Sequence, residues 1–306
     1  MSSTETNARA AALEAFAAVR RPPQEWVDYT SAGAVLVVGR RGAGETATLD
    51  LAARLSGELT PSALLLGDAG AEPEETLQER ADAIGVPLWF GGEVSLSGHL
   101  GDFRLSGETR RRRLGQATPL PRRFDLVLDL CDPPLLQREL PPPGYFAPAL
   151  SGREPAEVIP ELAALVGEFQ KPRYFRYDTS LCAHGRNGIE GCTRCLDACP
   201  AFAINPDGEG ITVDPLLCQG AGSCVTVCPS GALRPTAPEA ADLLGALREG
   251  LLRYRGLGGT SPVVLFHEEG DEGLAALAGE NVLPLTLESI GVVGPEIALG
   301  ALAWTP

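Results

Sequence analysis

The sequence predicts an α/β fold interrupted by a small inserted α+β domain. Three observations support this prediction. Apolar runs of strand length alternate with helical repeats over the first half of the chain, seven of the eight cysteines lie between residues 182 and 228, and strand and helix patterns return after them. Such alternation favours a mostly parallel sheet covered on both faces. We therefore divide the chain into an N-terminal helix (1–30), an α/β domain (31–150), a connector (151–175), a cysteine-rich domain (176–236) and a helix with a partial α/β segment (237–306).

The elements are predicted in chain order from the spacing of apolar residues. A first helix at 8–20 has Leu13, Phe16 and Val19 on one face. In the α/β domain we expect strands at 34–38, 63–66, 86–90 and 124–130, helices at 45–55 and 74–84, and a turn with an edge strand at 97–105. The proline-rich residues 133–148 predict an extended surface connector. Further on we expect helices at 161–169, from Pro238 onward, at 272–277 and at 290–303, and strands at 263–266 and 282–285.

Composition excludes several classes of protein. The formal net charge is −15, which disfavours nucleic-acid binding because phosphates would be repelled. No run approaches the ~20 apolar residues of a membrane span, and the polar, acidic start is unlike a secretory signal. The cysteines cluster instead of spreading as a disulfide framework does. We expect a cytoplasmic protein that is not inserted in a membrane.

The cysteine-rich stretch is an internal repeat in which each half ends in C-x3-C-P. Aligning Cys195 with Cys224 and Cys199 with Cys228 places Cys218 opposite Ile189, and Cys192 opposite Ala221. Each half therefore lacks a different cysteine of the pattern C-x2-C-x2-C-x3-C-P, which holds iron–sulfur clusters. Zinc bound by C-x2-C pairs is the competing interpretation. The repeated C-x3-C-P endings and the count of seven cysteines favour iron–sulfur.

Residues 174–235 resemble the two-cluster bacterial ferredoxin family, which implies a ferredoxin-like dicluster domain. In that family the fourth cysteine of each run ligates the other cluster. The resemblance implies one [4Fe–4S] cluster held by Cys182, Cys192, Cys195 and Cys228, and a second cluster held by Cys199, Cys218 and Cys224. With Ala221 at its fourth corner, the second site resembles the [3Fe–4S] site of seven-iron ferredoxins. The alternative is a [4Fe–4S] cluster completed by water or by a distant side chain such as Cys131 or His184.

The phrases around this segment, among them S-G-H-L-G-D-F-R-L at 97–105, resemble a larger group of bacterial cytoplasmic iron–sulfur proteins. We therefore expect an electron carrier between redox proteins, with no catalytic residue of its own. The first alternative is an iron–sulfur subunit of a flavin- or nucleotide-dependent oxidoreductase. No motif supports a flavin, and the glycine-rich Gly39–Gly44 is interpreted as a turn in preference to a phosphate loop. The second alternative is a non-redox protein that senses oxygen or iron.

Overall fold

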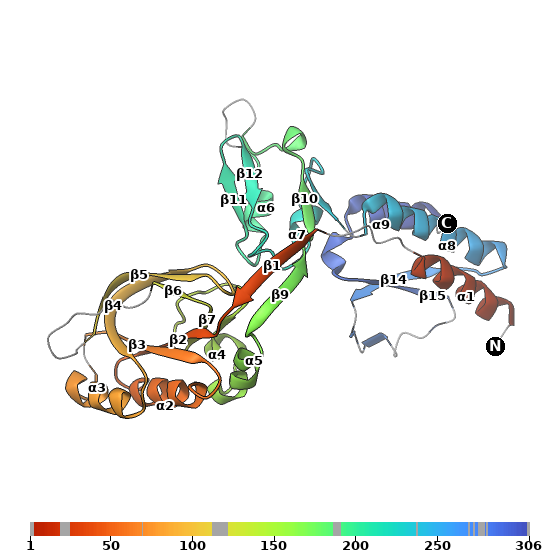
Figure 1. The fold of residues 1–306 in the computed structure, drawn as a ribbon. Helices are drawn as coiled ribbons and strands as arrows, with labels where there is room; N and C mark the ends of the chain where they lie inside the picture. Colours follow the sequence, from red (N-terminus) through yellow and green to blue (C-terminus); the bar gives the residue numbers. More distant parts are fainter. Residues whose placement is uncertain are drawn as a thin grey trace. The chain divides into compact units, whose positions relative to one another are not determined.

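A computed structural model describes residues 3–18, 25–68, 70–111, 122–185, 191–236, 238–268, 270–271, 273–274, 279 and 281–304. The chain forms two compact units, one made of residues 27–171 and the other of residues 1–26 and 172–306 (Figure 1). None of the described helices combines the length and apolar character that a membrane span requires. The five-part division made from the sequence is finer than these two units and stays a prediction.

The unit of residues 27–171 is built on a seven-stranded mixed sheet. Its strands, in spatial order, are β6 (Arg123–Phe124), β5 (Phe103–Arg110), β4 (Leu88–Ser97), β3 (Thr60–Leu66), β2 (Ala34–Arg40), β7 (Leu126–Asp129) and β8 (Tyr145–Phe146). The pairs from β4 to β8 are parallel, as predicted, whereas β5 pairs antiparallel with both β4 and β6. The turn followed by an edge strand predicted at 97–105 corresponds to a turn and strand β5, but the two-residue β6 pairs outside Phe103 and Arg104 and forms the end of the sheet.

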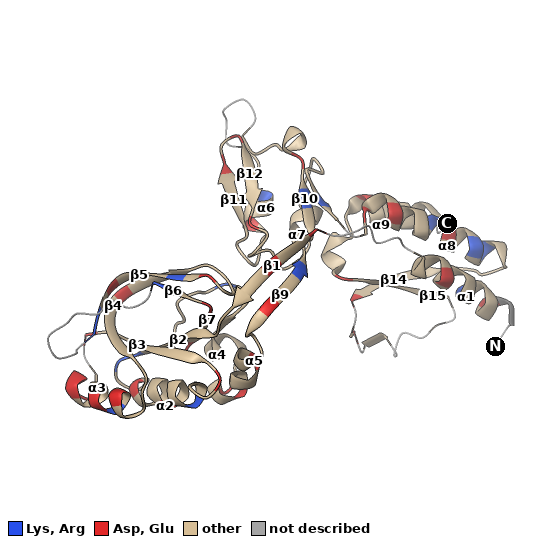
Figure 2. Ribbon diagram, viewed as in Figure 1, with Lys and Arg blue, Asp and Glu red and all other residues tan. Residues whose placement is uncertain are grey.

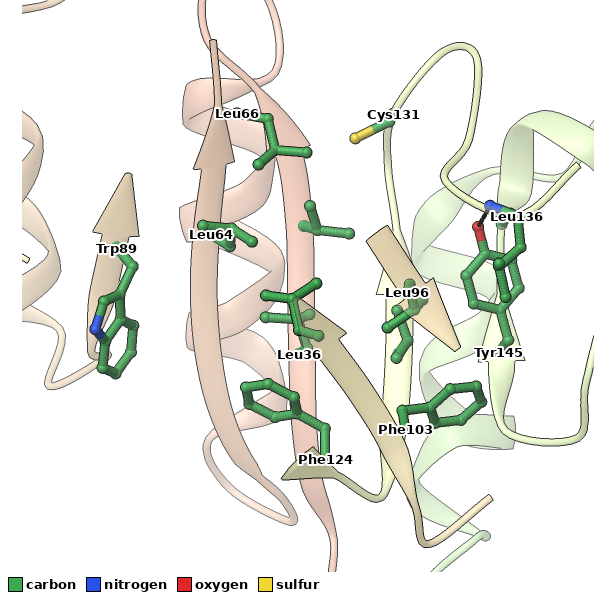
Figure 3. Close-up of a cluster of buried hydrophobic side chains, with 14 residues drawn as sticks. Leu36, Leu64, Leu66, Trp89, Leu96, Phe103, Phe124, Cys131, Leu136 and Tyr145 are labelled. Carbon is green, nitrogen blue, oxygen red and sulfur yellow. Dashed lines mark hydrogen bonds between the residues drawn. The ribbon is translucent and has the colours of Figure 1, made fainter. Parts of the chain in front are cut away.

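The central strands are buried at consecutive positions, which requires cover on both faces of the sheet. The helices of this unit are α2 (Glu45–Leu55), α3 (Glu74–Ala83), α4 (Pro148–Ser151), the 3-10 turn η1 (Pro155–Val158) and α5 (Ile159–Ala163). α2 packs against β2 and β3. Acidic side chains gather along α3 (Figure 2). On one side of the sheet, a core that includes Leu36, Phe103 and Tyr145 also buries Cys131 (Figure 3).

Several boundaries differ from the sequence prediction. The strand predicted at 124–130 is split at Asp125, whose carboxylate accepts hydrogen bonds from the backbone of Ala32 and Ala34, each at 2.9 Å. The helix predicted at 161–169 is wrong beyond residue 163. The chain there forms strand β9 (Gly167–Pro172), which pairs with β1 (Trp26–Ser31), a strand that the sequence did not reveal. The proline-rich connector contains β8, so part of it lies inside the fold.

The second unit combines two small cores. The first core holds the cysteines, and its elements are β10 (Phe175–Tyr177), the 3-10 turn η2 (Thr179–Leu181), α6 (Arg194–Asp197), β11 (Ile204–Asp207), β12 (Gly210–Val213), α7 (Ser223–Thr226) and β13 (Leu233–Pro235). The other core is formed by α1 (Ser3–Ala17), α8 (Ala240–Gly256), β14 (Val263–Glu268), β15 (Val282–Leu287), the 3-10 turn η5 (Ile290–Val292) and α9 (Pro295–Trp304).

The N-terminal helix packs on the C-terminal segment, from which it is separated by more than 200 residues. Phe16 lies against α8 so closely that a Cβ added at Gly250 would stand 2.4 Å from its ring. α1 begins earlier than the predicted helix, and Val19 lies outside the described residues. The parallel pair β14–β15 confirms both predicted strands. The helix predicted at 272–277 lies mostly outside the described residues, and the one predicted at 290–303 is divided at Gly294 into η5 and α9.

Candidate metal centre

Five of the seven clustered cysteines pack in one apolar core. Two single-turn helices, α6 and α7, carry Cys195 and Cys224, which are both buried. The hairpin β11–β12 and the pair β10–β13 supply the surrounding apolar side chains. Cys199, Cys218 and Cys228 are half-buried against the same core. The local fold therefore turns thiols from both halves of the repeat toward one interior.

The first group of thiols lies around Cys195. Burial raises the pKa of the Cys195 thiol to about 11, and the next contributions come from the charges of neighbouring thiols. In order of influence, the neighbours of Cys195 are Cys192, Cys182 and Cys228. The charges of these three thiols all raise the pKa of Cys195, and the assignment of the four cysteines to one cluster stays a prediction.

The second group lies around Cys224. Burial raises the pKa of this thiol to about 12, and the neighbouring thiols that add to the shift are Cys218, Cys199 and Cys195. Cys218 and Cys199 are the partners predicted for the second cluster. Cys195 of the first group and Cys224 of the second are buried in the same core, so the two groups are adjacent. This arrangement suits the passage of an electron from one group to the other.

Hydrogen-bond donors point at two of these sulfurs. The backbone N–H of Ala203 donates to Cys199 Sγ at 3.3 Å. Burial raises the pKa of Cys228, but hydrogen bonds from the backbone of Leu233 and from Ser230 outweigh it, so the net pKa lies below its usual value. Donors of this kind stabilise thiolates and tune the reduction potential of a bound cluster.

Tyr177 also reaches the first group. Its hydroxyl accepts a hydrogen bond from the backbone of Ile211 at 3.1 Å. Burial raises the pKa of Tyr177 to about 12, and the next cause is a hydrogen bond to Cys182. A Cβ added at Gly210 would stand 2.6 Å from this hydroxyl, so the hairpin holds it in place. The sequence analysis missed Tyr177, because its role depends on β10 lying against the β11–β12 hairpin.

The second group has Ala221 where the first has Cys192. A cavity beside it is lined by Cys199, Cys218 and Cys224 together with Ala221, the polar residues Gln219 and Ser223, and apolar residues. Neither suggested replacement ligand lines it. His184 is buried and its Nδ1 bonds to the carbonyl of Cys192 at 2.9 Å, whereas Cys131 is fully buried in the sheet core of the 27–171 unit. The described lining therefore offers three thiols and no fourth.

These residues fit iron–sulfur clusters. Thiols in groups of four and three, apolar surroundings and N–H donors to sulfur are the features by which proteins bind and tune such clusters. Across the described residues, no three His, Cys, Asp or Glu side chains approach closely enough to bind a single metal ion.

The glycine-rich loop at Gly39–Gly44 forms a turn that leads into Glu45, the first residue of α2. The Glu45 carboxylate accepts hydrogen bonds from the backbone of Ala71 and Glu72 at 3.2 and 3.3 Å. Burial raises the pKa of Glu45, but hydrogen bonds from Gly42 and Arg41 outweigh it and lower the net value. A carboxylate therefore occupies the start of α2, where a phosphate would bind.

Comparison with known proteins identifies the cysteine segment. Residues 190–232 match the family model described as a 4Fe-4S dicluster domain. Similarity to curated proteins is confined to short stretches. An indolepyruvate oxidoreductase subunit IorA of Thermococcus kodakarensis is 43% identical over 47 residues, which are 15% of this chain and 7% of the relative.

Two further proteins of the same name give similar matches. The one from Methanothermobacter thermautotrophicus is 41% identical over 51 residues, 15% of this chain and 8% of the relative. The one from Pyrococcus abyssi is 46% identical over 41 residues, 13% of this chain and 6% of the relative. The matched stretch spans less than a tenth of the length of these relatives. With the geometry, these comparisons identify residues 190–232 as a 4Fe–4S dicluster domain within a larger chain.

Proposed function

We propose that this protein carries electrons between redox partners in the cytoplasm through two clusters held by the seven cysteines. The first would be a [4Fe–4S] cluster on Cys182, Cys192, Cys195 and Cys228. The second would be held by Cys199, Cys218 and Cys224. When bound, the clusters supply reversible one-electron chemistry, and the chain holds them adjacent, surrounds them with apolar side chains and donates hydrogen bonds to their thiolates.

The single observation that carries this proposal is that cysteines of both groups share one buried core. Cys195 of the first group and Cys224 of the second are buried there, with Cys199, Cys218 and Cys228 packed against it. Adjacent clusters are what a carrier needs to accept an electron at one site and release it at the other.

The three-thiol lining supports a second cluster that differs from the first. We propose a [3Fe–4S] cluster there, with a [4Fe–4S] cluster whose fourth iron takes a non-protein ligand as the alternative. Ala221 at the fourth corner and the placement of His184 and Cys131 elsewhere support an open corner in either form.

The test is anaerobic purification of the full chain, with iron and sulfide analysis and EPR before and after dithionite. We expect iron and sulfide in cluster amounts and two reducible centres. A single centre, or zinc without sulfide, contradicts the proposal. An oxidised, EPR-silent protein with eight irons contradicts the three-iron form.

The ligand sets are tested by a matched pair of cysteine variants. Cys182→Ser removes a proposed ligand that lies outside the matched 190–232 segment, and it should eliminate the first-cluster signal. Cys131→Ala removes a thiol of the 27–171 core and should leave both cluster signals unchanged. Equal cluster content in wild type and Cys182→Ser would exclude Cys182 as a ligand.

A second candidate function is that of an iron–sulfur subunit within an oxidoreductase. The observation that favours it is the similarity of a short stretch of the chain to proteins named indolepyruvate oxidoreductase subunit IorA. A flavin in the visible spectrum of the purified chain would support a flavin-dependent form of this candidate. The Glu45 carboxylate at the start of α2 disfavours a nucleotide phosphate at Gly39–Gly44, because two negative groups would lie at the same helix end.

A further inference from the structure

A C-terminal segment, Ser289–Val292, meets the second cysteine loop at the residue that replaces a ligand. The Ser289 hydroxyl donates a hydrogen bond to the carbonyl of Ala221 at 3.1 Å. The same hydroxyl accepts a hydrogen bond from the backbone of Gly291 at 3.1 Å. Ser289 thus links its own turn to the corner of the second thiol group.

The two backbones approach more closely than side chains would allow. A Cβ added at Gly291 would stand 2.1 Å from the carbonyl oxygen of Ala221. A Cβ added at Gly222 would stand 2.6 Å from the carbonyl carbon of Gly291, and Gly222 also has a φ of +82°. Atoms essentially never approach to such distances, so any residue other than glycine at position 291 forces the two backbones apart.

The segment is fixed from its other side as well. The backbone N–H of Ile290 donates to the Glu268 carboxylate at the end of β14, at 2.9 Å. Val292 packs against the cysteine core and also against the core of α1, α8 and β15. The contact at Ala221 is therefore held by the folded C-terminal part of the unit.

Comparison of the two halves of the repeat shows that the residues contacted by the C-terminal segment differ between them. Where the first half has Cys192–Thr193, the second has Ala221–Gly222. The two replaced positions are the two that Ser289 and Gly291 contact. Ala221–Gly222 is therefore both the place where the second half lacks a cysteine and the place that the C-terminal segment contacts.

Building on the proposed function, we propose that Ser289–Val292 closes the Ala221 corner of the second cluster. The closed segment excludes water, thiols and other small ligands of iron from that corner and slows the exchange of iron there. Ser289 and Gly291 act as positioning residues, since their contacts are with the Ala221–Gly222 backbone.

The test measures iron release from anaerobically purified full-length protein to bathophenanthroline disulfonate, with EPR identifying which cluster decays. Gly291→Ala should accelerate decay of the second cluster and leave the first unchanged. Ser289→Ala removes one hydrogen bond without adding volume and should accelerate the decay about fivefold. Ser289→Thr keeps the hydroxyl and should restore the wild-type rate. Ile290→Ala, at a side chain that is 53% exposed, is the matched control and should have no effect.

Equal second-cluster decay in wild type, Gly291→Ala and Ser289→Ala overturns the closure. So does equal acceleration at both clusters, which would indicate general destabilisation. If circular dichroism shows that Gly291→Ala does not fold, the decay rates of Ser289→Ala and Ser289→Thr test the closure instead. Iron and sulfide in the wild type, with no difference among variants, rejects the closure alone, whereas a wild type without clusters rejects the proposed function and the closure with it.

Discussion

Phe202 and Gly231 occupy equivalent positions in the two halves of the cysteine repeat, and both have left-handed backbones, with φ of +52° and +65°. Each is the third residue after the last cysteine of its half. Glycine adopts this conformation freely, whereas a residue with a side chain pays ~1 kcal/mol or more. The first half thus carries local strain that the second avoids.

This relationship predicts the ranking of two variants that both delete the ring. Phe202→Gly should be more stable than Phe202→Ala by ~1 kcal/mol, because only glycine relieves the backbone strain. Gly231→Ala should lose a similar amount. The measurement is the thermal unfolding midpoint under anaerobic conditions. Gly208→Ala, at a φ of +58° with open space around it, provides the control for the backbone cost alone. Equal midpoints for the two Phe202 variants would refute the strain.

Tyr177 is expected to raise the reduction potential of the first cluster. A hydrogen bond to a ligand sulfur stabilises the more negative, reduced form. Tyr177→Phe should therefore lower that potential by about 20–60 mV, the one-electron equivalent of one net hydrogen bond. A potentiometric titration followed by EPR measures it. Tyr174→Phe is the control, since the thiol that affects the pKa of Tyr174 is Cys218 of the second group. An unchanged or raised potential in Tyr177→Phe would show that the hydroxyl does not tune the cluster.

Ala221→Cys restores the cysteine that the second half lacks. If the second cluster has three irons, this variant should bind a fourth iron, because four thiolates suit a [4Fe–4S] cluster. Iron analysis should then rise from about seven to about eight per chain, with the matching change in EPR. Ser106→Cys adds a thiol at an exposed position of β5 in the 27–171 unit and should leave the count unchanged. An equal iron content in Ala221→Cys and wild type would contradict the proposal that the second site lacks a fourth protein ligand.

Glu45 should make the 27–171 unit sensitive to acid. Its net pKa is lowered in the folded protein, so its stabilising contribution is present above the unfolded value of 4.5 and is lost as pH falls through the lower, folded value. Unfolding monitored between pH 7 and pH 3 should show this loss in the wild type. Glu45→Gln should be less stable at pH 7 and show a flatter acid dependence. An identical acid dependence in the two proteins would contradict this role.

The sequence by itself determined the chemistry of the cysteine segment and much of the α/β pattern. Covalent spacing fixes which thiols a short loop can bring together, so the C-x3-C-P repeat was sufficient to expect two thiol groups with Ala221 at an empty corner. Helices α2 and α3 were equally visible, because apolar residues at helical spacing bury one face wherever the helix packs.

Tertiary structure alone decided the contacts between distant segments. Ser289 reaches Ala221 across 68 residues, and Phe16 packs on Gly250, yet neither pair has a local signal. β1 and β9 escaped prediction for the same reason, since a short strand is stabilised by its partner more than by its own residues. The spacing of the seven cysteines predicts where clusters would bind, but only the tertiary fold places Ser289 and Gly291 against Ala221, where the repeat lacks a cysteine.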